Sequence, residues 1–386
     1  MRKLVILRGI SGSGKTTWVK KNRLEPYTLS PDKLFEMTES VSLFPEGGMG
    51  IDHSRLFQFT MGLYEEILEQ RMRDGSFVVI DAVNIKNTDF SRYGRLAKKY
   101  GYEVICMDFS SVSLETCLKR KPAALKMQIK QDYKKMLNQK LPPNINLFQP
   151  ADFDKVLLGR NDLTYCQKIH HIGDIHGCSR ALSKCLSDMK DDEMYIFCGD
   201  YINKGPDTAG VLQYLFDISD RPNVIFLEGN HEEHLRKWVS GEKTGNYEFD
   251  NSTAPQLEES GISKKSVRRF LTGLKECFWY RAGRKEVFIC HGGVSSMAGN
   301  PVFIPSRNLI NGCGSFMDTK ICDDNFMKDS DGIIQIHGHR SLANHSHLIN
   351  ECCYSLEGNV EAGGVLRELV LDVESGMLDC VEYSES

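Results

Sequence analysis

Short apolar runs alternate with amphipathic stretches over the first 160 residues. Runs that predict buried strands occupy 3–7, 76–80 and 103–107, and helical periodicity predicts helices over 15–21, 55–73 and 88–100. This alternation is typical of an α/β domain, a parallel sheet flanked by helices on both faces. A stretch rich in proline and asparagine, 138–150, closes its helical part, and 155–158 is expected to be its last strand.

A second strand and helix series follows, and its strands share one property. Each apolar run leads directly into a short motif rich in Asp, His, Asn and Gly. In an α/β sandwich, the carboxyl ends of strands are where a site assembles. We therefore predict an α/β sandwich over 165–386, behind a first domain over 1–160. The five runs are 168–172, 194–198, 224–227, 287–290 and 333–336.

Composition narrows the class of protein. A chain of 386 residues exceeds the size at which one core keeps growing, so two domains are expected. Its apolar runs are strand-sized, which predicts no membrane span. The 13 cysteines show no Cys-x-x-Cys pair, which favours reduced thiols in a cytoplasm. A net charge of -4 means that any polyanion must bind a local basic patch.

The run 3–7 ends in Gly-x-x-x-x-Gly-Lys-Thr, and a helix is predicted to follow. Glycines at these positions let backbone N–H groups surround phosphates at a helix amino end. Lys15 is placed to bridge the β- and γ-phosphates of ATP, and the Thr16 hydroxyl to ligate Mg²⁺. The residues expected to contact nucleotide are Gly9, Ser11, Gly12, Ser13, Gly14, Lys15, Thr16, Thr17 and Arg120.

Two carboxylates are candidates for the acceptor side of this loop. Asp32 is placed to accept the proton of an attacking hydroxyl, although Ser-Pro-Asp also reads as an ordinary helix start. Asp81 ends the run 76–80 and could orient the acceptor or hold Mg²⁺ through water. Basic residues at 119–121, 126, 130 and 134 form a stripe that suits either a phosphate lid or a solvated helix face.

The later motifs supply metal ligands. Asp174 and His176 are two apart, so both can reach one metal, and Asp200 is the candidate bridge to a second. The remaining candidate ligands are neutral: Asn230, His291 and His339. Mixed oxygen and imidazole ligands suit two divalent transition metals, Mn²⁺ foremost, better than Mg²⁺ or Ca²⁺. His231, next to a ligand, is placed to protonate a leaving oxygen.

These motifs resemble two known families. The second half resembles the calcineurin-type metallophosphoesterases, and the resemblance implies that Asp200 is shared between the metals and that His231 is the general acid. The first half resembles the polynucleotide 5′-hydroxyl kinases, with Lys15, Thr16, Asp32 and Asp81 on the kinase pattern. The order, kinase then metallophosphoesterase, is that of the bacterial and phage polynucleotide kinase–phosphatases of RNA repair.

The chain departs from these families at substrate-facing positions. Where such phosphatases usually have Asp and Arg, this chain has Asn203 and Lys204. Lys204 cannot form the two parallel hydrogen bonds of an arginine to phosphate, and Arg307 is a candidate to replace part of that contact. In the kinase half, the family's arginine a few residues after the catalytic Asp, which holds the acceptor strand's phosphate, is absent, and Lys33 and Phe35 stand nearby instead.

The resemblance implies an enzyme that phosphorylates 5′-hydroxyl ends with ATP and Mg²⁺ and removes a 3′-phosphate or a 2′,3′-cyclic phosphate. Its expected partners are RNA or DNA ends in the cytoplasm of a bacterium or a phage-infected host. No ligase motif follows His339, so a separate RNA ligase is expected; homo-oligomerisation is left open. Two other functions compete: a phosphoprotein phosphatase with a nucleotide-sensing loop, and a small-molecule kinase fused to a dinucleotide phosphatase.

Overall fold

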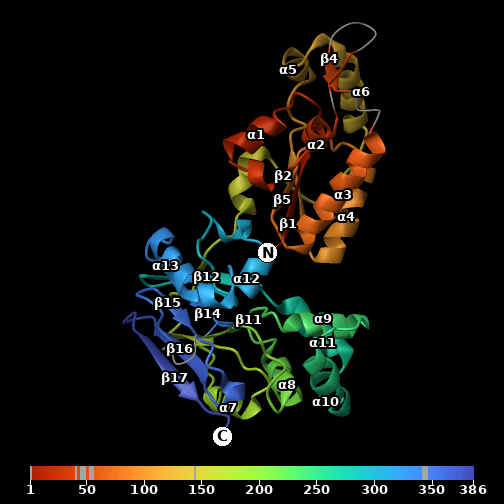
Figure 1. Ribbon diagram of the computed structural model, residues 1–386. Helices are drawn as coiled ribbons and strands as arrows, with labels where there is room; N and C mark the ends of the chain where they lie inside the picture. Colours follow the sequence, from red (N-terminus) through yellow and green to blue (C-terminus); the bar gives the residue numbers. More distant parts are fainter. Residues whose placement is uncertain (1, 40, 44–48, 52–55, 143–144, 341–346) are drawn as a thin grey trace. The chain divides into compact units, whose positions relative to one another are not determined.

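The computed structural model describes residues 2–39, 41–43, 49–51, 56–142, 145–340 and 347–386 (Figure 1). The chain forms two compact units. The first contains Met1–Leu158 together with Val302–Ser306, and the second contains Gly159–Pro301 together with Arg307–Ser386.

The first unit contains a five-stranded sheet in the order β2-β5-β1-β6-β7, with every neighbouring pair parallel. Its strands are β1 (Lys3–Arg8), β2 (Thr28–Leu29), β5 (Val78–Ile80), β6 (Glu103–Asp108) and β7 (Asn146–Phe148), and a separate hairpin joins β3 (Val41–Leu43) and β4 (Met49–Ile51). Its helices are α1 (Lys15–Lys21), α2 (Pro31–Thr38), α3 (Phe57–Arg73), α4 (Asn87–Tyr100), α5 (Leu114–Lys119) and α6 (Lys126–Leu137). The predicted parallel α/β architecture is confirmed.

The central strand β1 explains why helices cover both faces of this sheet. Successive side chains of a strand point to opposite faces. Leu4 and Ile6 pack in a core built largely from α3 and α4, which lie side by side (Figure 1). Val5 and Leu7 pack on the other face, with Trp18 of α1. A run that is buried on both faces shows no alternation, as observed for this strand.

The prediction of a last strand at 155–158 is wrong. Lys155 and Val156 end a 3₁₀ helix, Pro150–Val156, and the edge strand is β7. Val156 is apolar because this short helix buries it beside Trp18 and Phe153. The edge strand leaves Asn146 and Leu147 exposed, so it lacks the apolar pattern by which buried strands are recognised.

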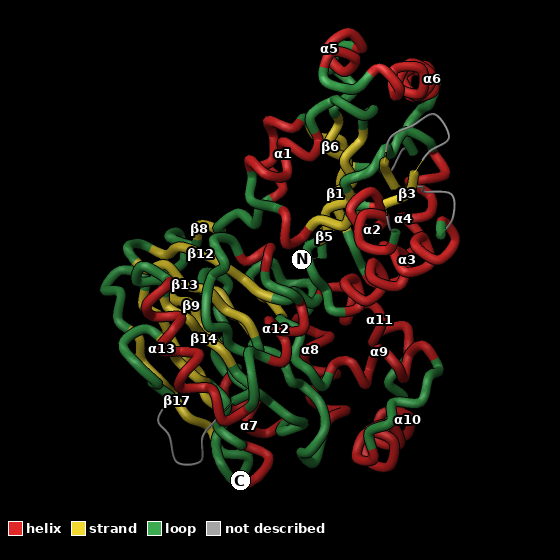
Figure 2. The backbone as a smooth tube through the Cα atoms, turned by 45° about the horizontal axis from the view of Figure 1, so that its top comes forward, coloured by secondary structure: helices red, strands yellow, loops and turns green. Residues whose placement is uncertain are grey.

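The second unit contains two five-stranded sheets, in the orders β11-β10-β9-β16-β17 and β15-β14-β13-β12-β8 (Figure 2). The strands are β8 (Asn161–Asp162), β9 (Lys168–Ile172), β10 (Met194–Phe197), β11 (Val224–Phe226), β12 (Cys277–Ala282), β13 (Lys285–Cys290), β14 (Ile334–His337), β15 (Cys353–Ser355), β16 (Leu366–Asp372) and β17 (Leu378–Tyr383). The helices are α7 (Ser179–Cys185), α8 (Thr208–Ile218), α9 (Glu232–Ser240), α10 (Ala254–Glu259), α11 (Lys264–Gly273), α12 (Ser306–Asn311) and α13 (Thr319–Asp329).

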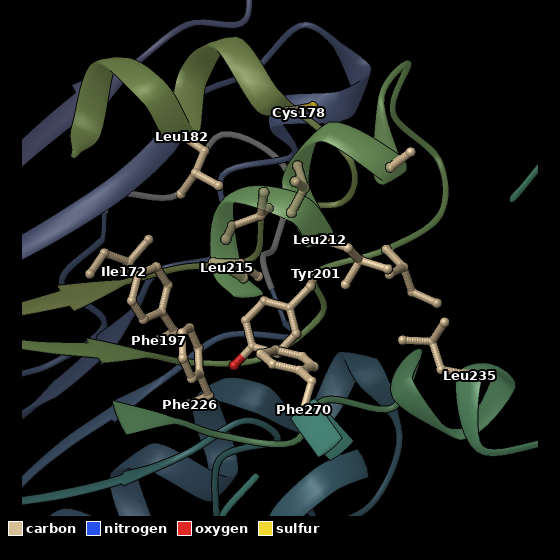
Figure 3. Packing of buried hydrophobic residues seen from close by; sticks show 14 of the residues in the cluster. Ile172, Cys178, Leu182, Phe197, Tyr201, Leu212, Leu215, Phe226, Leu235 and Phe270 are labelled. Carbon is tan, nitrogen blue, oxygen red and sulfur yellow. The ribbon is translucent and has the colours of Figure 1, made fainter. Parts of the chain in front are cut away.

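Strand β10 lies between two hydrophobic layers. Its Met194 and Ile196 join residues of the other sheet in the core of the predicted sandwich. Tyr195 and Phe197 face the helices that cover the outer side. In this outer layer Tyr201 packs against Phe226 and Phe270, at centroid distances of 5.9 and 5.5 Å (Figure 3). The layer therefore anchors the loop that follows β10.

Within the described ranges, no helix combines the length and the apolar character needed to cross a membrane. All 13 cysteines lie in those ranges and are free thiols.

Candidate functional site

The phosphate-binding loop connects β1 to α1 as predicted. Gly12 and Gly14 have φ values of 85° and 99°, in the left-handed region that side chains disfavour. A Cβ atom on Gly12 would lie 2.6 Å from the carbonyl oxygen of Cys117, so the loop packs against the backbone of α5. Gly14 is the N-cap of α1, which places the loop at a helix amino end.

Lys15 lies at the centre of this loop and is buried. Its Nζ donates to the carbonyl oxygens of Gly9 and Ile10, at 2.8 and 3.1 Å. Burial lowers the pKa of the Lys15 ammonium to about 8, against the opposing effects of Asp81 and Asp32. A buried ammonium held only by neutral carbonyls and two nearby carboxylates would gain from an anionic ligand.

The loop forms the floor of a pocket of about 980 Å³. Gly9 is not among the lining residues; it contributes the carbonyl that Lys15 contacts. The sequence did not predict Lys21, Ser30 or Glu36 in the lining. The predicted residues that line the pocket are Ser11, Gly12, Ser13, Gly14, Lys15, Thr16, Thr17, Asp32, Asp81 and Arg120.

The two predicted carboxylates face this pocket from neighbouring strand ends. Asp81 follows β5, and its Oδ2 accepts a hydrogen bond of 2.7 Å from the Thr16 hydroxyl. A hydroxyl beside a carboxylate fits Mg²⁺, which takes oxygen ligands. Asp32 is the second residue of α2, whose N-cap is Ser30. Its carboxylate therefore lies in the first turn of a helix that opens onto the pocket.

The basic stripe divides into two parts. Arg120 and Lys121 line the pocket, and Arg120 Nη1 donates to the Gly12 carbonyl at 3.1 Å. The remaining basic residues, Lys126, Lys130 and Lys134, are exposed on α6. The start of the stripe thus lies where a phosphate lid would, and its end lies on an exposed helix face.

In the second unit, the predicted metal ligands meet at the carboxyl ends of strands. Asp200 is the common element of the cluster. Its Oδ2 lies 3.3 Å from His291 Nε2, 3.7 Å from His176 Nε2 and 3.9 Å from His231 Nε2. Two groups of potential ligands share Asp200, one with His176 and His231 and one with His291 and His339. A carboxylate between two ligand groups is what a bridging role requires.

The donor set fits two divalent cations. His291 Nδ1 donates to the Cys198 carbonyl at 2.9 Å, which leaves Nε2 facing Asp200 and Asn230. His176 is oriented in the same way by the Ile202 carbonyl. Among the described residues, the buried Oδ1 of Asp174 has no hydrogen-bond partner.

Close packing around Asp174 also fits a ligand role. A Cβ atom on Gly338 would lie 1.9 Å from Asp174 Oδ1, so a glycine is needed for this close approach. The backbone N–H of His339 donates to Asp174 Oδ2 at 2.8 Å, which orients the carboxylate.

The electrostatics of the cluster also fit cation binding. Burial, with Glu357 and Asp200 nearby, raises the pKa of the Asp174 carboxyl well above its usual value. Burial opposes ionisation of Asp200 as well, but His291, His231 and His176 hold the pKa of its carboxyl well below its usual value. Ionising both buried carboxylates together requires a positive charge between them.

Backbone strain is concentrated at the same residues. Left-handed φ values in residues other than glycine are uncommon and cost free energy, of order 1–3 kcal/mol each. They persist where the surrounding structure holds them, often at functional sites. In this cluster they occur at His176 (44°), Asp200 (52°), Asn203 (70°), Lys204 (64°) and His339 (60°).

Asn203, which replaces the usual aspartate, still contacts the candidate acid. Its Nδ2 lies 2.7 Å from His231 Nδ1, and its Oδ1 accepts a hydrogen bond of 2.7 Å from the Thr253 hydroxyl. This arrangement makes Nδ1 of His231 an acceptor and leaves the ring proton on Nε2, toward Asp200. Burial lowers the pKa of His231 to about 4.

The two candidate phosphate contacts lie in different places. Lys204 is in the cluster, with Nζ 2.9 Å from His176 Nε2 and 3.3 Å from Glu361 Oε1. Arg307 is the second residue of α12 and lines a separate hollow of about 250 Å³ with Asn308, Asn311, Gly312 and Gly314.

Two acidic residues of the site were missed from the sequence. Glu232 begins α9, and its carboxylate accepts the backbone N–H groups of Asp200, Tyr201 and Gly229. Burial raises the pKa of Glu232 to about 8. Glu357 follows β15 and joins Asp174 and His176 in a third group of potential metal ligands. For Glu357 the signal was the one used elsewhere, an acidic residue just after a strand, whereas Glu232 stands at a helix start.

Comparison with known proteins agrees with this architecture. The sequence profile of calcineurin-like phosphoesterases matches residues 167–367, just over half of the 386 residues. The profile of the AAA domain matches residues 4–123. The phosphoesterase unit and the P-loop unit are thus recognised separately.

Curated relatives match over part of the chain. A symmetrical bis(5′-nucleosyl)-tetraphosphatase from Legionella pneumophila (strain Lens) is 28% identical over 130 residues, 33% of this chain and 44% of the relative. The same enzyme from Buchnera aphidicola (subsp. Schizaphis graminum) is 37% identical over 79 residues, 19% of this chain and 28% of the relative. The chain therefore spans less than half the length of these relatives.

Solved structures resemble the chain at low identity. A protein serine/threonine phosphatase from Saccharomyces cerevisiae has a TM-score of 0.42 and 12% identity, covering 58% of this chain and 83% of its own. A metallophosphoesterase from Sphaerobacter thermophilus has a TM-score of 0.34 and 13% identity, covering 57% of this chain and 89% of its own.

Proposed function

Because the chain belongs to the calcineurin-like phosphoesterase family and carries a P-loop unit ahead of that domain, we propose that it heals RNA ends. One observation carries the proposal. The P-loop pocket has a carboxylate, Asp32, on its wall, as a kinase for alcohols needs, and the same chain has a cluster of carboxylates and imidazoles that could hold two metals. A chain so equipped adds a phosphate at one end of a substrate and removes one at the other.

In the kinase half, the P-loop holds the triphosphate of ATP. Backbone N–H groups of the loop and Lys15 bind the β- and γ-phosphates, and Arg120 covers them from the lid. Thr16 and Asp81 would hold Mg²⁺, which supplies charge neutralisation on the phosphates. Asp32 accepts the proton of the 5′-hydroxyl as it attacks the γ-phosphate.

In the phosphatase half, two divalent metals, Mn²⁺ foremost, would supply a hydroxide nucleophile and neutralise phosphoryl oxygens. Asp174 and His176 would hold the first and Asn230, His291 and His339 the second, with Asp200 shared. As an imidazolium, with protons on both ring nitrogens, His231 would donate its Nε2 proton to the leaving oxygen and become neutral; Asn203 contacts its Nδ1. Lys204 contacts a phosphoryl oxygen as a point charge.

The two activities fit one kind of damage. Ribonucleases that use the 2′-hydroxyl leave a 5′-hydroxyl and a 2′,3′-cyclic phosphate or 3′-phosphate. The two repairs need opposite conditions, since transfer to an alcohol must exclude water and hydrolysis must activate it. Separate units on one chain meet both needs. A separate RNA ligase joins the healed ends, and the reaction takes place in a bacterial or phage-infected cytoplasm.

A second candidate rests on the curated relatives. They are tetraphosphatases of dinucleotides, and hydrolysis of a phosphoanhydride releases a good leaving group. Such a substrate needs little help from a general acid, in keeping with the neutral Asn203 beside His231. On this view the chain joins a small-molecule kinase to a dinucleotide phosphatase.

The experiment uses a short RNA with 5′-hydroxyl and 3′-phosphate ends, [γ-³²P]ATP, Mg²⁺ and Mn²⁺. We expect ³²P at the 5′ end and inorganic phosphate from the 3′ end, with DNA as a parallel substrate. Diadenosine tetraphosphate and a phosphopeptide serve as competitors at equal concentration. No label in RNA, together with rapid cleavage of either competitor, would exclude end healing.

A further inference from the structure

Strand β15 brings an additional acidic residue to the phosphoesterase cluster. β15 pairs in parallel with β14, so its carboxyl end lies at the same edge of the sheet as His339. Glu357 follows two residues after β15 and has 4% of its surface exposed. The loop is closely packed, because a Cβ atom on Gly173 would lie 2.3 Å from the carbonyl oxygen of Leu356. The position of Glu357 is therefore set by the backbone around it.

The two oxygens of Glu357 have different surroundings. Oε1 accepts a hydrogen bond of 2.6 Å from the backbone N–H of Asn359. Oε2 lies 3.8 Å from His176 Nε2. Ligand atoms of Glu357, Asp174 and His176 all lie within 4.8 Å of one another, and all three residues are buried. One oxygen thus orients the carboxylate by its backbone contact, and the other is directed at the predicted ligands.

Acidic side chains are concentrated around His176. Asp174, Asp200 and Glu357 place three buried carboxylates beside one imidazole. The nearby cation Lys204 is shared, because its Nζ lies 3.3 Å from Glu361 Oε1. Buried like charges at this spacing are unfavourable unless a cation binds between them.

We propose that Glu357 is a ligand of the metal held by Asp174 and His176. The proposal rests on the metal-dependent half of the proposed function and not on its RNA substrate. It makes the two metal positions chemically unequal, because the first then has carboxylates from Asp174, Asp200 and Glu357 with one imidazole. The second has two imidazoles, an amide and the shared Asp200 carboxylate. The oxygen-rich position is the better match to Mn²⁺, and the imidazole-rich position is the better match to Zn²⁺.

Metal binding is measured on the full chain without any phosphoester substrate, by calorimetric titration with MnCl₂ after EDTA treatment and by elemental analysis after gel filtration. Glu357→Gln is expected to weaken one class of Mn²⁺ site at least about tenfold and to reduce retained Mn²⁺ by one per chain. Glu361→Gln is the matched control, since Glu361 contacts Lys204 and is outside the ligand group; it should retain wild-type Mn²⁺ binding.

Thermal melting separates a ligand from a structural residue. Because Glu357→Gln removes one of three repelling carboxylates, it should melt no lower than wild type in EDTA and gain less from added Mn²⁺. Unchanged Mn²⁺ affinity and stoichiometry in Glu357→Gln, an equal loss in Glu361→Gln, or a large drop in melting temperature in EDTA would each overturn the assignment. Failure of RNA labelling would leave these metal measurements unaffected, so the two hypotheses fail independently.

Discussion

The two candidate sites of this chain are built by opposite means. The P-loop pocket is built mainly from backbone, with glycines at positive φ, a helix amino end and about 980 Å³ of space. The phosphoesterase cluster is built from buried side chains, with carboxylates and imidazoles within 4.8 Å of one another. In the P-loop pocket, left-handed φ values occur at glycines, which adopt them without strain. In the phosphoesterase cluster, residues with side chains such as Asp200 and Lys204 adopt them.

This difference predicts different responses to mutation. Binding in the P-loop pocket depends on backbone groups and a few charged side chains. The first unit should therefore stay folded when one of these charges is removed. A buried cluster couples each charge to its neighbours, so single changes alter both catalysis and stability.

The largest effect is expected from Asp200→Asn. Asp200 contacts three histidines and is shared between the ligand groups, so both metal positions lose a carboxylate. Hydrolysis of p-nitrophenyl phosphate should slow by roughly 30- to 900-fold, because the activation free energy rises by roughly 2–4 kcal/mol. Labelling of 5′-hydroxyl RNA should remain near wild type. Equal loss of both activities would contradict independent sites.

Lys15→Ala provides the reverse test on the P-loop. Without the Lys15 ammonium, the transferred phosphate loses one neighbouring positive charge. The activation free energy of 5′-labelling should therefore rise by roughly 2–4 kcal/mol. Because Lys15 contacts only its own loop carbonyls in the described structure, the melting temperature should change little. Phosphatase turnover is the internal control; if it disappears as well, the two-site account is wrong.

Asp32→Asn should slow the kinase while leaving ATP binding intact. Asparagine keeps the size of the side chain in the first turn of α2 but cannot accept the proton of the hydroxyl. The expected loss is about 10²-fold or more in transfer rate. Glu36→Gln, on the wall of the same pocket, is the matched control and should have a small effect. A fully active Asp32→Asn would return Asp32 to the helix-start interpretation.

Asn203→Asp should strengthen proton donation by His231, the candidate general acid of the phosphatase. A carboxylate beside His231 Nδ1 would hold a proton there and raise the pKa of His231 above its present value near 4. Turnover of an RNA 3′-phosphate, whose leaving group is an alkoxide, should rise relative to p-nitrophenyl phosphate by up to about tenfold. An unchanged ratio would mean that His231 does not protonate the leaving group.

The smallest effect is expected from replacing Lys126, Lys130 and Lys134 by Ala. These residues are exposed on α6, outside the pocket lining, and are expected to act only by long-range attraction of RNA. Binding of single-stranded RNA should lose about 2 units of slope in a plot of log affinity against log salt. The kinase rate at saturating RNA should not change; a large rate loss would indicate direct contact.

The parts that could be predicted from sequence share a physical cause. A buried strand is apolar on both faces, and a P-loop requires contiguous glycines, so β1 and residues 9–16 were predictable. The metal motifs were predictable because each follows such a strand. The edge strand β7 was not predicted, since exposed strands lack the apolar pattern.

The missed site residues depended on tertiary contacts. Glu357 follows a strand of only three residues, and its significance comes from Asp174 and His176, far away in the sequence. Glu232 was missed because a carboxylate at a helix start is common, and its hydrogen bonds to the Asp200 loop appear only in the folded chain. The roles of all the candidate site residues, Lys15, Asp32 and His231 among them, stay predictions.

The central claim, that one chain heals both ends of a broken RNA, is tested most directly with a nicked tRNA. The substrate carries 5′-hydroxyl and 2′,3′-cyclic phosphate ends and is incubated with ATP, Mg²⁺ and Mn²⁺, with and without an added ATP-dependent RNA ligase. We predict 5′-phosphate and 3′-hydroxyl ends from this protein alone and full-length tRNA only when the ligase is present. Unaltered ends, while diadenosine tetraphosphate or a phosphopeptide is rapidly hydrolysed, would contradict the account.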